Sequence, residues 1–154
     1  MNPIITEFTS LFFTGLLAGE ELVVRYGVHL ALGSLDEHNQ IRIRQALIRK
    51  LRVLVPAIIV PTAISGIAAL SIANSPLGFG FRCAGMLNLL VIVLTTLIGT
   101  VPINKQVLNW QPDAPPLHWK ALIRRWAQLD VVRSVAAIMA FACFIIAVAL
   151  QMVE

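Results

Sequence analysis

The fold of this chain is decided by its C-terminal stretch, Val131–Val153, which reads VVRSVAAIMAFACFIIAVALQMV. A helix that crosses a bilayer needs about 20 mostly apolar residues, and this stretch has that length and a single charged side chain near its start. Segments of the same character lie at residues 8–32, 53–73 and 83–101. We therefore expect an all-α integral membrane four-helix bundle, with residues 1–154 forming one domain.

The composition of the whole chain also favours a membrane protein. Of its 154 residues, 58% are hydrophobic and 13% are charged, whereas soluble domains average about 45–50% apolar and about 25% charged residues. Charged residues are too sparse for a disordered chain, and two cysteines are too few for a disulfide scaffold. The net charge of +4 could indicate a nucleic-acid-binding protein, so the positions of the basic residues decide between a nucleic acid and a membrane as the partner.

The basic residues gather in two loops of the predicted bundle. The loop at residues 33–52 contains five and the loop at residues 102–130 contains four, whereas the opposite side has only Arg82. Such an excess is typical of cytoplasmic loops. We therefore expect a multi-pass protein of the cell membrane with both loops in the cytoplasm and both termini on the non-cytoplasmic side. The partner of this chain is then the lipid bilayer, and we expect no nucleic acid.

Two of the helices are expected to be longer than the bilayer is thick. The run Ser34–Glu37 has the pattern of a capping box, which predicts a second helix from near Leu35 to Ala73, about 58 Å long at 1.5 Å per residue. Pro115 and Pro116 suit the first turn of the fourth helix, which would be about as long. Because the hydrocarbon core is about 30 Å thick, helices 2 and 4 should extend into the cytoplasm.

The second loop is rich in tryptophan and proline. Trp110, Trp119 and Trp126 suit the membrane surface, where tryptophan is enriched. The run Gln111–Pro116 contains three prolines, which favours an ordered segment that could cover a site. Both an aromatic belt and a lid remain open.

Charged residues inside the first span locate the candidate site. Such residues cost about 2.5–3.5 kcal/mol each on insertion scales and tend to be functional. Helical spacing places Glu21, Arg25 and His29 on one side of the helix, with Glu20 about 100° away. Glu20 has no partner one turn away, so we expect it to stay protonated unless another helix supplies an arginine or a metal is bound.

Polar residues of two other spans reach the same depth. Asp130 and Arg133 begin the fourth span, Trp126 lies one turn before Asp130, and Asn104 follows the third span. These residues predict a polar pocket that opens toward the cytoplasm. The alternative is purely structural, with Glu21 paired to Arg25 and Asp130 paired to Arg133 so that the bundle is held in register.

The sequence leaves open whether the chain binds a metal and whether it forms an oligomer. Glu20, His29 and Asp130 could converge as a set that suits zinc or non-haem iron, although no pair has the spacing typical of a metal site. Gly15 and Gly19 form a Gly-x-x-x-Gly pattern that lets a second helix approach closely. That helix could belong to the same chain or to a second copy in a homo-oligomer.

A group of short motifs around the second loop carries a family resemblance. They are Val101–Lys105, Trp110–Pro116, Trp119–Leu122, Arg125–Trp126 and Arg133–Ser134. Together they resemble the anthrone-oxygenase-like family of small four-span membrane proteins, most bacterial members of which are known only as a domain of unknown function. The resemblance is detailed from Val101 to Ser134, and it implies a four-helix membrane bundle.

The resemblance also implies a site and a chemistry. It places polar positions of the family at Asn104, Trp126 and Arg133, whereas members usually carry a histidine at the position of Asp130. Fungal relatives are implicated in oxidising anthrones to anthraquinones without an obvious cofactor. The resemblance therefore requires no cofactor, and the sequence itself leaves the cofactor unknown.

In such a reaction a base removes an acidic proton, donor groups stabilise the resulting anion, and the anion reacts with dioxygen. We assign the base to Asp130 or His29, the anion stabilisers to Arg133 and Asn104, and a ring-stacking wall to Trp126. The substrate would be a lipophilic aromatic or quinol-like molecule. The remaining substrate-binding candidates are the charged residues of the first span, Glu20, Glu21 and Arg25.

Two other functions remain open from the sequence. The chain could be a non-catalytic membrane module, either the partner subunit of another protein or a protein that binds a lipophilic small molecule. It could also be a small transporter or a proton path through Glu20 and Glu21, although four spans without an inverted repeat are few for a carrier.

Overall fold

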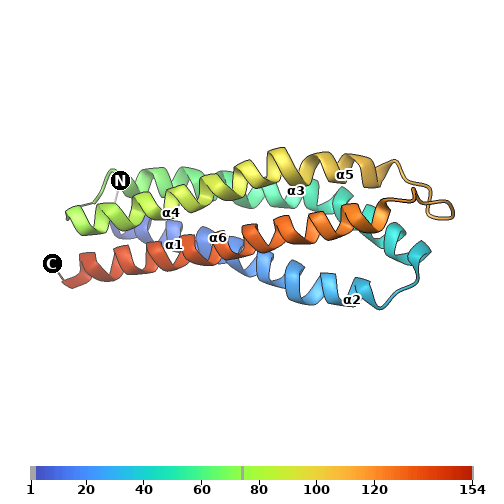
Figure 1. Cartoon of the computed structure of the whole chain (residues 1–154). Coiled ribbons are helices and arrows are strands. Elements are labelled where there is room, and N and C mark those ends of the chain that lie inside the picture. The colour runs from blue at the N-terminus through green and yellow to red at the C-terminus, as the bar shows by residue number, and fades with distance from the viewer. Residues whose placement is uncertain (1–2, 74, 154) are drawn as a thin grey trace.

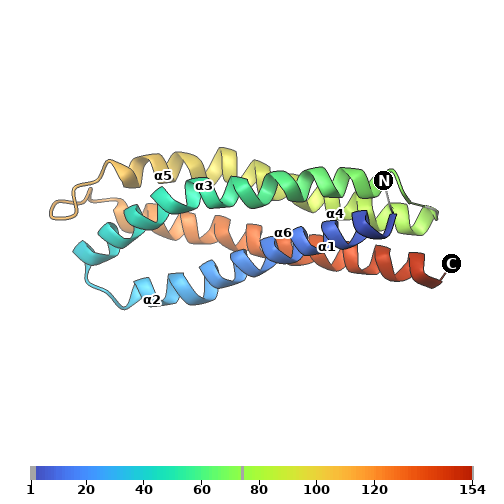
Figure 2. The ribbon, with the colours of Figure 1, turned by 180° about the vertical axis from the view of Figure 1, so that it is seen from behind.

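The computed structural model describes residues 3–73 and 75–153, which form four antiparallel helical rods (Figures 1 and 2). The first rod consists of α1 (Pro3–Leu22), the π-helix η1 (Val23–Val28) and α2 (His29–Gly33), and the second is α3 (Glu37–Leu70). The third rod consists of α4 (Pro76–Leu94), the π-helix η2 (Thr95–Thr100) and α5 (Val101–Leu108), and the fourth is α6 (Trp119–Val153). The two ends of the chain lie at one end of the bundle, together with the α3–α4 connection. We call this the terminal end and the opposite one the loop end.

Three helices of the described chain are long and apolar enough to span a membrane. They are Glu37–Leu70, Pro76–Leu108 and Trp119–Met152. The first rod, which carries Glu7 and Glu20, is not one of the three. Large apolar side chains are exposed along all the rods, as expected for a surface that faces lipid. The all-α prediction is confirmed, and the helices indicate a membrane protein.

Helix α3 begins at Glu37, two residues later than predicted, because Asp36 is the N-cap. The Asp36 carboxylate accepts hydrogen bonds from the backbone N–H of Asn39 at 3.1 Å and from its side-chain amide at 2.7 Å. These hydrogen bonds hold the pKa of Asp36 below its usual range. The expected capping box at Ser34–Glu37 is therefore wrong, and α3 ends at Leu70.

Two further helix starts differ from the prediction. Helix α4 begins at Pro76, because the Ser75 hydroxyl accepts a hydrogen bond from the backbone N–H of Gly78 at 3.1 Å. Arg82, expected in an outer loop, therefore lies inside a helix. Helix α6 begins only at Trp119, so the two prolines expected in its first turn precede the helix.

The bundle contains two hydrophobic clusters. The first, toward the terminal end, surrounds the fully buried Phe144 of α6. Helices approach closely here, since a Cβ added to Gly85 would lie 2.7 Å from the Phe144 ring and one added to Gly15 would lie 3.1 Å from the Phe141 ring. The close approach predicted at Gly15 thus occurs within the chain, whereas Gly19 has no atom within 4 Å of an added Cβ.

The second cluster lies toward the loop end. Trp110, Trp119 and Trp126 are all buried in it, at 9%, 7% and 8% exposure. The tryptophans therefore pack in the core of the chain, and the expected aromatic belt is wrong. The other buried members of this second cluster are Ile41, Ile48, Ile103 and Val107.

A buried ion pair at the terminal end was not expected from the sequence. The Arg82 guanidinium donates hydrogen bonds to the Glu7 carboxylate and to the Gln151 side chain, and Arg82 is 1% exposed. This contact joins α1, α4 and α6.

Candidate functional site

A cavity of about 280 Å³ lies among the four rods beside the second cluster. Its wall is largely apolar, with side chains from α3 and from the third rod, including Val55, Ile59, Val93 and Leu97. Polar side chains from each rod also line it. They are Glu20 from α1, Arg52 from α3, Thr96 and Thr100 from η2, Asn104 from α5, and Trp126, Asp130 and Arg133 from α6.

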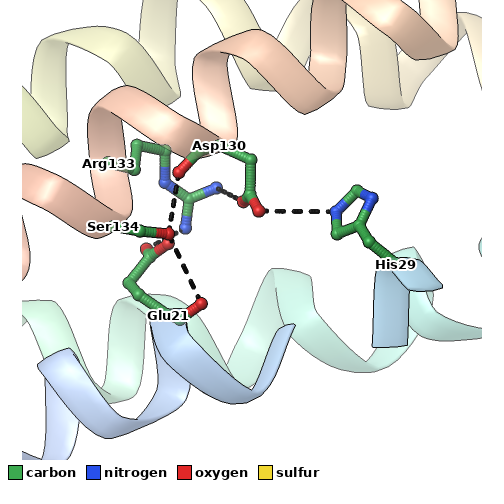
Figure 3. A network of polar contacts seen from close by, with 5 residues as sticks. All are labelled: Glu21, His29, Asp130, Arg133 and Ser134. Atoms are coloured by element: carbon green, nitrogen blue, oxygen red, sulfur yellow. Dashed lines mark hydrogen bonds and ion pairs between the residues drawn. The ribbon is translucent and has the colours of Figure 1, made fainter. Parts of the chain in front are cut away.

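A network of charged and polar side chains lies beside this cavity (Figure 3), and its members Asp130 and Arg133 line the cavity. The Arg133 guanidinium of α6 donates a hydrogen bond to the Glu21 carboxylate of α1, and both side chains are buried. Arg133 Nη1 also lies 3.9 Å from Asp130 Oδ1. The other Asp130 oxygen, Oδ2, lies 3.4 Å from His29 Nε2. The Ser134 hydroxyl donates to the Asp130 backbone carbonyl at 2.8 Å, one turn earlier on α6.

The cross-helix pairing corrects the structural alternative drawn from the sequence. Glu21 pairs with Arg133 rather than with Arg25, and the Asp130–Arg133 contact is long. The π-helix η1 separates Glu21 from His29, and its wider turns change which residues share a face. Arg25 instead lies with its guanidinium carbon 5.3 Å from the centre of the Tyr26 ring.

A second pocket lies on the other side of Asp130. It also has a volume of about 280 Å³, and Asp130 lines both spaces. His29 and Arg25 line the second pocket but not the cavity. The structure thus places His29 behind Asp130, while Glu21 lines neither space and contacts the cavity only through Arg133.

Buried polar atoms without a hydrogen-bond partner within the described chain are concentrated at the cavity. Buried polar atoms in native proteins are nearly always paired, so these atoms provide donors and acceptors for a polar ligand. Those on residues lining the cavity are Glu20 Oε2, Thr96 Oγ1, Thr100 Oγ1, Asn104 Oδ1, Trp126 Nε1, both carboxylate oxygens of Asp130 and Arg133 Nε.

Trp126 is in contact with two nitrogen-rich side chains. Its ring centre lies 4.4 Å from that of His29, with 40° between the planes. The guanidinium carbon of Arg44 lies 5.4 Å from the ring centre, within range of a cation–π interaction. In the sequence Arg44 is only one of the basic residues that indicate orientation, because a count of loop charges does not distinguish a buried arginine from an exposed one.

Both π-helices contribute to the cavity wall. Thr96 and Thr100 belong to η2, and Val24 belongs to η1. π-Helices are rare and often occur at functional sites. Thr100 can be placed at the depth of the polar residues from the sequence, whereas Thr96 cannot, since a single sequence contains no recognisable signal for a π-helix.

Two expectations about this region are not supported. Within residues 3–73 and 75–153, no three His, Cys, Asp or Glu side chains come together as a metal group, so Glu20 does not join His29 and Asp130. The proline-rich segment does not line the cavity. It packs instead against the start of α3, where the His38 ring nitrogen Nδ1 lies 2.7 Å from Asp113 Oδ1.

A family model described as anthrone oxygenase matches residues 45–143 of the chain. Neither a curated protein nor a solved structure matches. The matched range contains Asn104, Trp126, Asp130 and Arg133. The first rod, which supplies Glu20, Glu21 and His29, precedes it.

Proposed function

The chain belongs to the anthrone oxygenase family, and from this membership and the site geometry we propose that it is an integral membrane oxygenase acting on a lipophilic aromatic or quinol-like substrate. The observation that carries the proposal is that a carboxylate, an arginine and an amide, those of Asp130, Arg133 and Asn104, line one largely apolar cavity. The apolar wall suits a flat ring system, and the polar side suits proton removal and stabilisation of an anion.

The proposed topology has four spans, with the loop end in the cytoplasm and both termini on the non-cytoplasmic side. The support is the excess of lysine and arginine in the two connections at the loop end and in the adjoining helix ends. In this arrangement the first rod completes the bundle although its glutamates lower its hydropathy, because Glu7 and Glu21 are both paired with arginines of neighbouring helices.

Asp130 is the proposed base. Neither of its carboxylate oxygens accepts a hydrogen bond from the residues that the structure describes, and its side chain lines the cavity. In an anthrone, the proton would come from the methylene opposite the ring carbonyl, and its loss leaves an anion delocalised over the rings. His29 lies behind Asp130 at the second pocket, so it is placed to orient the carboxylate and to pass the proton on.

Stabilisation of the anion is assigned to Arg133 and Asn104, with Trp126 as a stacking wall. Glu21 is a positioning residue, because it holds the guanidinium of Arg133. The anion then reacts with dioxygen to form a carbon–oxygen bond, and the peroxide loses water to leave a carbonyl. One methylene and one dioxygen thus become one carbonyl and one water.

The test is dioxygen consumption by the purified protein in nanodiscs with anthrone as substrate. We expect one quinone for each dioxygen consumed, at a rate above that of spontaneous oxidation. Asp130→Asn should lower the rate about 10²–10⁴-fold, the contribution typical of general base catalysis. Asp113→Asn is the matched control, because the Asp113 side chain is 88% exposed and lies outside the cavity.

A wild-type rate equal to spontaneous oxidation would refute the oxygenase. If the protein binds the quinone product under these conditions without turning over the substrate, the function would be that of a lipophile-binding module. An unchanged rate in Asp130→Asn would refute the assignment of the base.

A further inference from the structure

Three arginines of the described chain are buried, and one of them lacks a carboxylate partner. Arg44, Arg82 and Arg133 are 5%, 1% and 6% exposed. Arg82 pairs with Glu7, and Arg133 pairs with Glu21. None of the ion pairs among the described residues includes Arg44.

The guanidinium of Arg44 is also short of hydrogen bonds. Its Nε and Nη1 atoms are buried without an acceptor in the described chain. The face of Trp126 offsets part of the cost of burying the charge, but a ring face does not replace hydrogen-bond acceptors for these N–H groups. A buried cation of this kind is strongly unfavourable unless an anion comes to it.

Arg44 lines a small void that lies beside the cavity. This void of about 10 Å³ is lined by Arg44 and, among others, by Ile48, Asn104 and Trp126. These last three residues also line the cavity, so the two spaces share a wall. The void has room for about one water-sized group, such as a single oxygen atom of a ligand.

The distribution of charge indicates which part of a ligand would lie here. The cavity is lined by the carboxylates of Asp130 and Glu20 as well as by Arg133, whereas no carboxylate of the described chain lines the void at Arg44, so an additional anionic substituent meets less repulsion at the void. Trp126 and Asp130 are four residues apart on α6, about 6 Å along the helix axis. A ligand that spans this distance can place an acidic group near Arg44 and its reacting carbon near Asp130.

We propose that Arg44, together with Asn104 and Trp126, forms an anion-binding subsite, and that the ligand of the cavity carries a carboxylate or an ionised phenol on its ring system. This inference rests on the proposed function, because it takes the cavity to be the substrate site. The subsite fixes the orientation of the ligand and so directs the reactive carbon to the base.

The experiment compares two probes, anthraquinone-2-carboxylate and 2-methylanthraquinone, which differ in charge and resemble each other in shape. Binding to the wild-type protein in nanodiscs is measured by quenching of tryptophan fluorescence. We expect the carboxylate to bind about 10- to 100-fold more tightly, the range given by charge-assisted hydrogen bonds. Arg44→Met should abolish this preference and leave the affinity for the methyl probe unchanged. Arg49→Met is the matched control, because Arg49 is exposed on the same helix.

Thermal unfolding without a probe gives a second measurement. Because Arg44 is an unpaired buried charge, Arg44→Met should raise the Tm, whereas a structural role of Arg44 would make the same change lower it. The anthraquinone carboxylate should raise the Tm of the wild-type protein and not that of Arg44→Met.

The outcomes separate this inference from the proposed function. Equal binding of both probes to the wild-type protein, or an equal loss of both in Arg44→Met, would overturn the anion-binding subsite and leave the cavity as a binding site. Binding of neither probe to the wild-type protein would overturn both the inference and the proposed substrate class.

Discussion

The ion pair between Glu21 and Arg133 should couple the two residues energetically, so that replacing both costs less stability than the sum of the two single replacements. Arg133→Met leaves the carboxylates of Glu21 and Asp130, which are 0% and 2% exposed, without their cation. Breaking a buried pair in this way typically costs about 3–5 kcal/mol. Glu21→Gln keeps a hydrogen-bond acceptor for Arg133, so its cost should be about 1–2 kcal/mol, the difference between a charged and a neutral hydrogen bond.

The double variant Glu21→Gln/Arg133→Met measures the coupling directly. Once Glu21 is neutral, the loss of Arg133 leaves Asp130 as the one buried carboxylate of this network without a cation. His29, which lies 3.4 Å from Asp130, can stabilise that charge. We therefore expect the double variant to lose less than the sum of the single variants, with a coupling of about 1–3 kcal/mol.

The assay is equilibrium unfolding in mixed micelles as the fraction of denaturing detergent increases, followed by circular dichroism. The pair Glu7–Arg82 at the terminal end is the control, because it is equally buried and lies away from the cavity. Its variants should unfold in the same coupled manner without changing quinone binding. Strictly additive losses in the Glu21–Arg133 cycle would refute the reasoning.

Two further predictions concern the packing that holds the site. Gly85→Ala should cost about 1–3 kcal/mol, because its Cβ would lie 2.7 Å from the fully buried Phe144 ring; Gly80→Ala on the same helix has no atom within 4 Å and should be neutral or stabilising in thermal unfolding. Gln45→Leu removes two hydrogen bonds of 2.9 Å to backbone carbonyls at the end of α5, so hydrogen exchange of the α5–α6 connection should accelerate, whereas the exposed Gln106→Leu should leave it unchanged.

The main helices could be predicted because apolar length is a local property of the sequence. The ends of the helices were less accurate, since Ser34 and Asp36 are both good N-cap residues and only the backbone geometry at Asn39 selects Asp36. The depth of the polar residues was also readable, and Asp130 and Arg133 do line a cavity together with Glu20. The ion-pair partners of these residues could not be predicted, because Arg133 pairs with Glu21, which lies 112 positions earlier in the chain.

The π-helix η1 explains why the side-chain partners within the first rod could not be predicted. Helical periodicity assigns Glu21, Arg25 and His29 to one face only if the helix is regular, and η1 breaks that regularity between the first and the last of them. Such an irregular turn is selected by tertiary contacts, here between the first rod and α6. A single sequence contains no measure of those contacts, so it does not show that Arg25 lines the second pocket and not the cavity.

The features that weaken the fold coincide in space with the proposed chemistry. Three such features lie at the cavity or at the void beside it. They are the oxygens of Asp130 and Glu20 that accept no hydrogen bond from the described residues, the guanidinium of Arg44, which has no carboxylate partner among those residues, and the π-helix η2. The terminal end shows that this chain can also bury charge in pairs, as it does at Glu7 and Arg82. Local rules of packing are usually broken where function requires it. A site that first accepts a lipophilic ring system and then stabilises its anion requires hydrogen-bond donors that no acceptor of the protein occupies. Because these donors gain an acceptor when an anion binds, a bound anion should stabilise the fold.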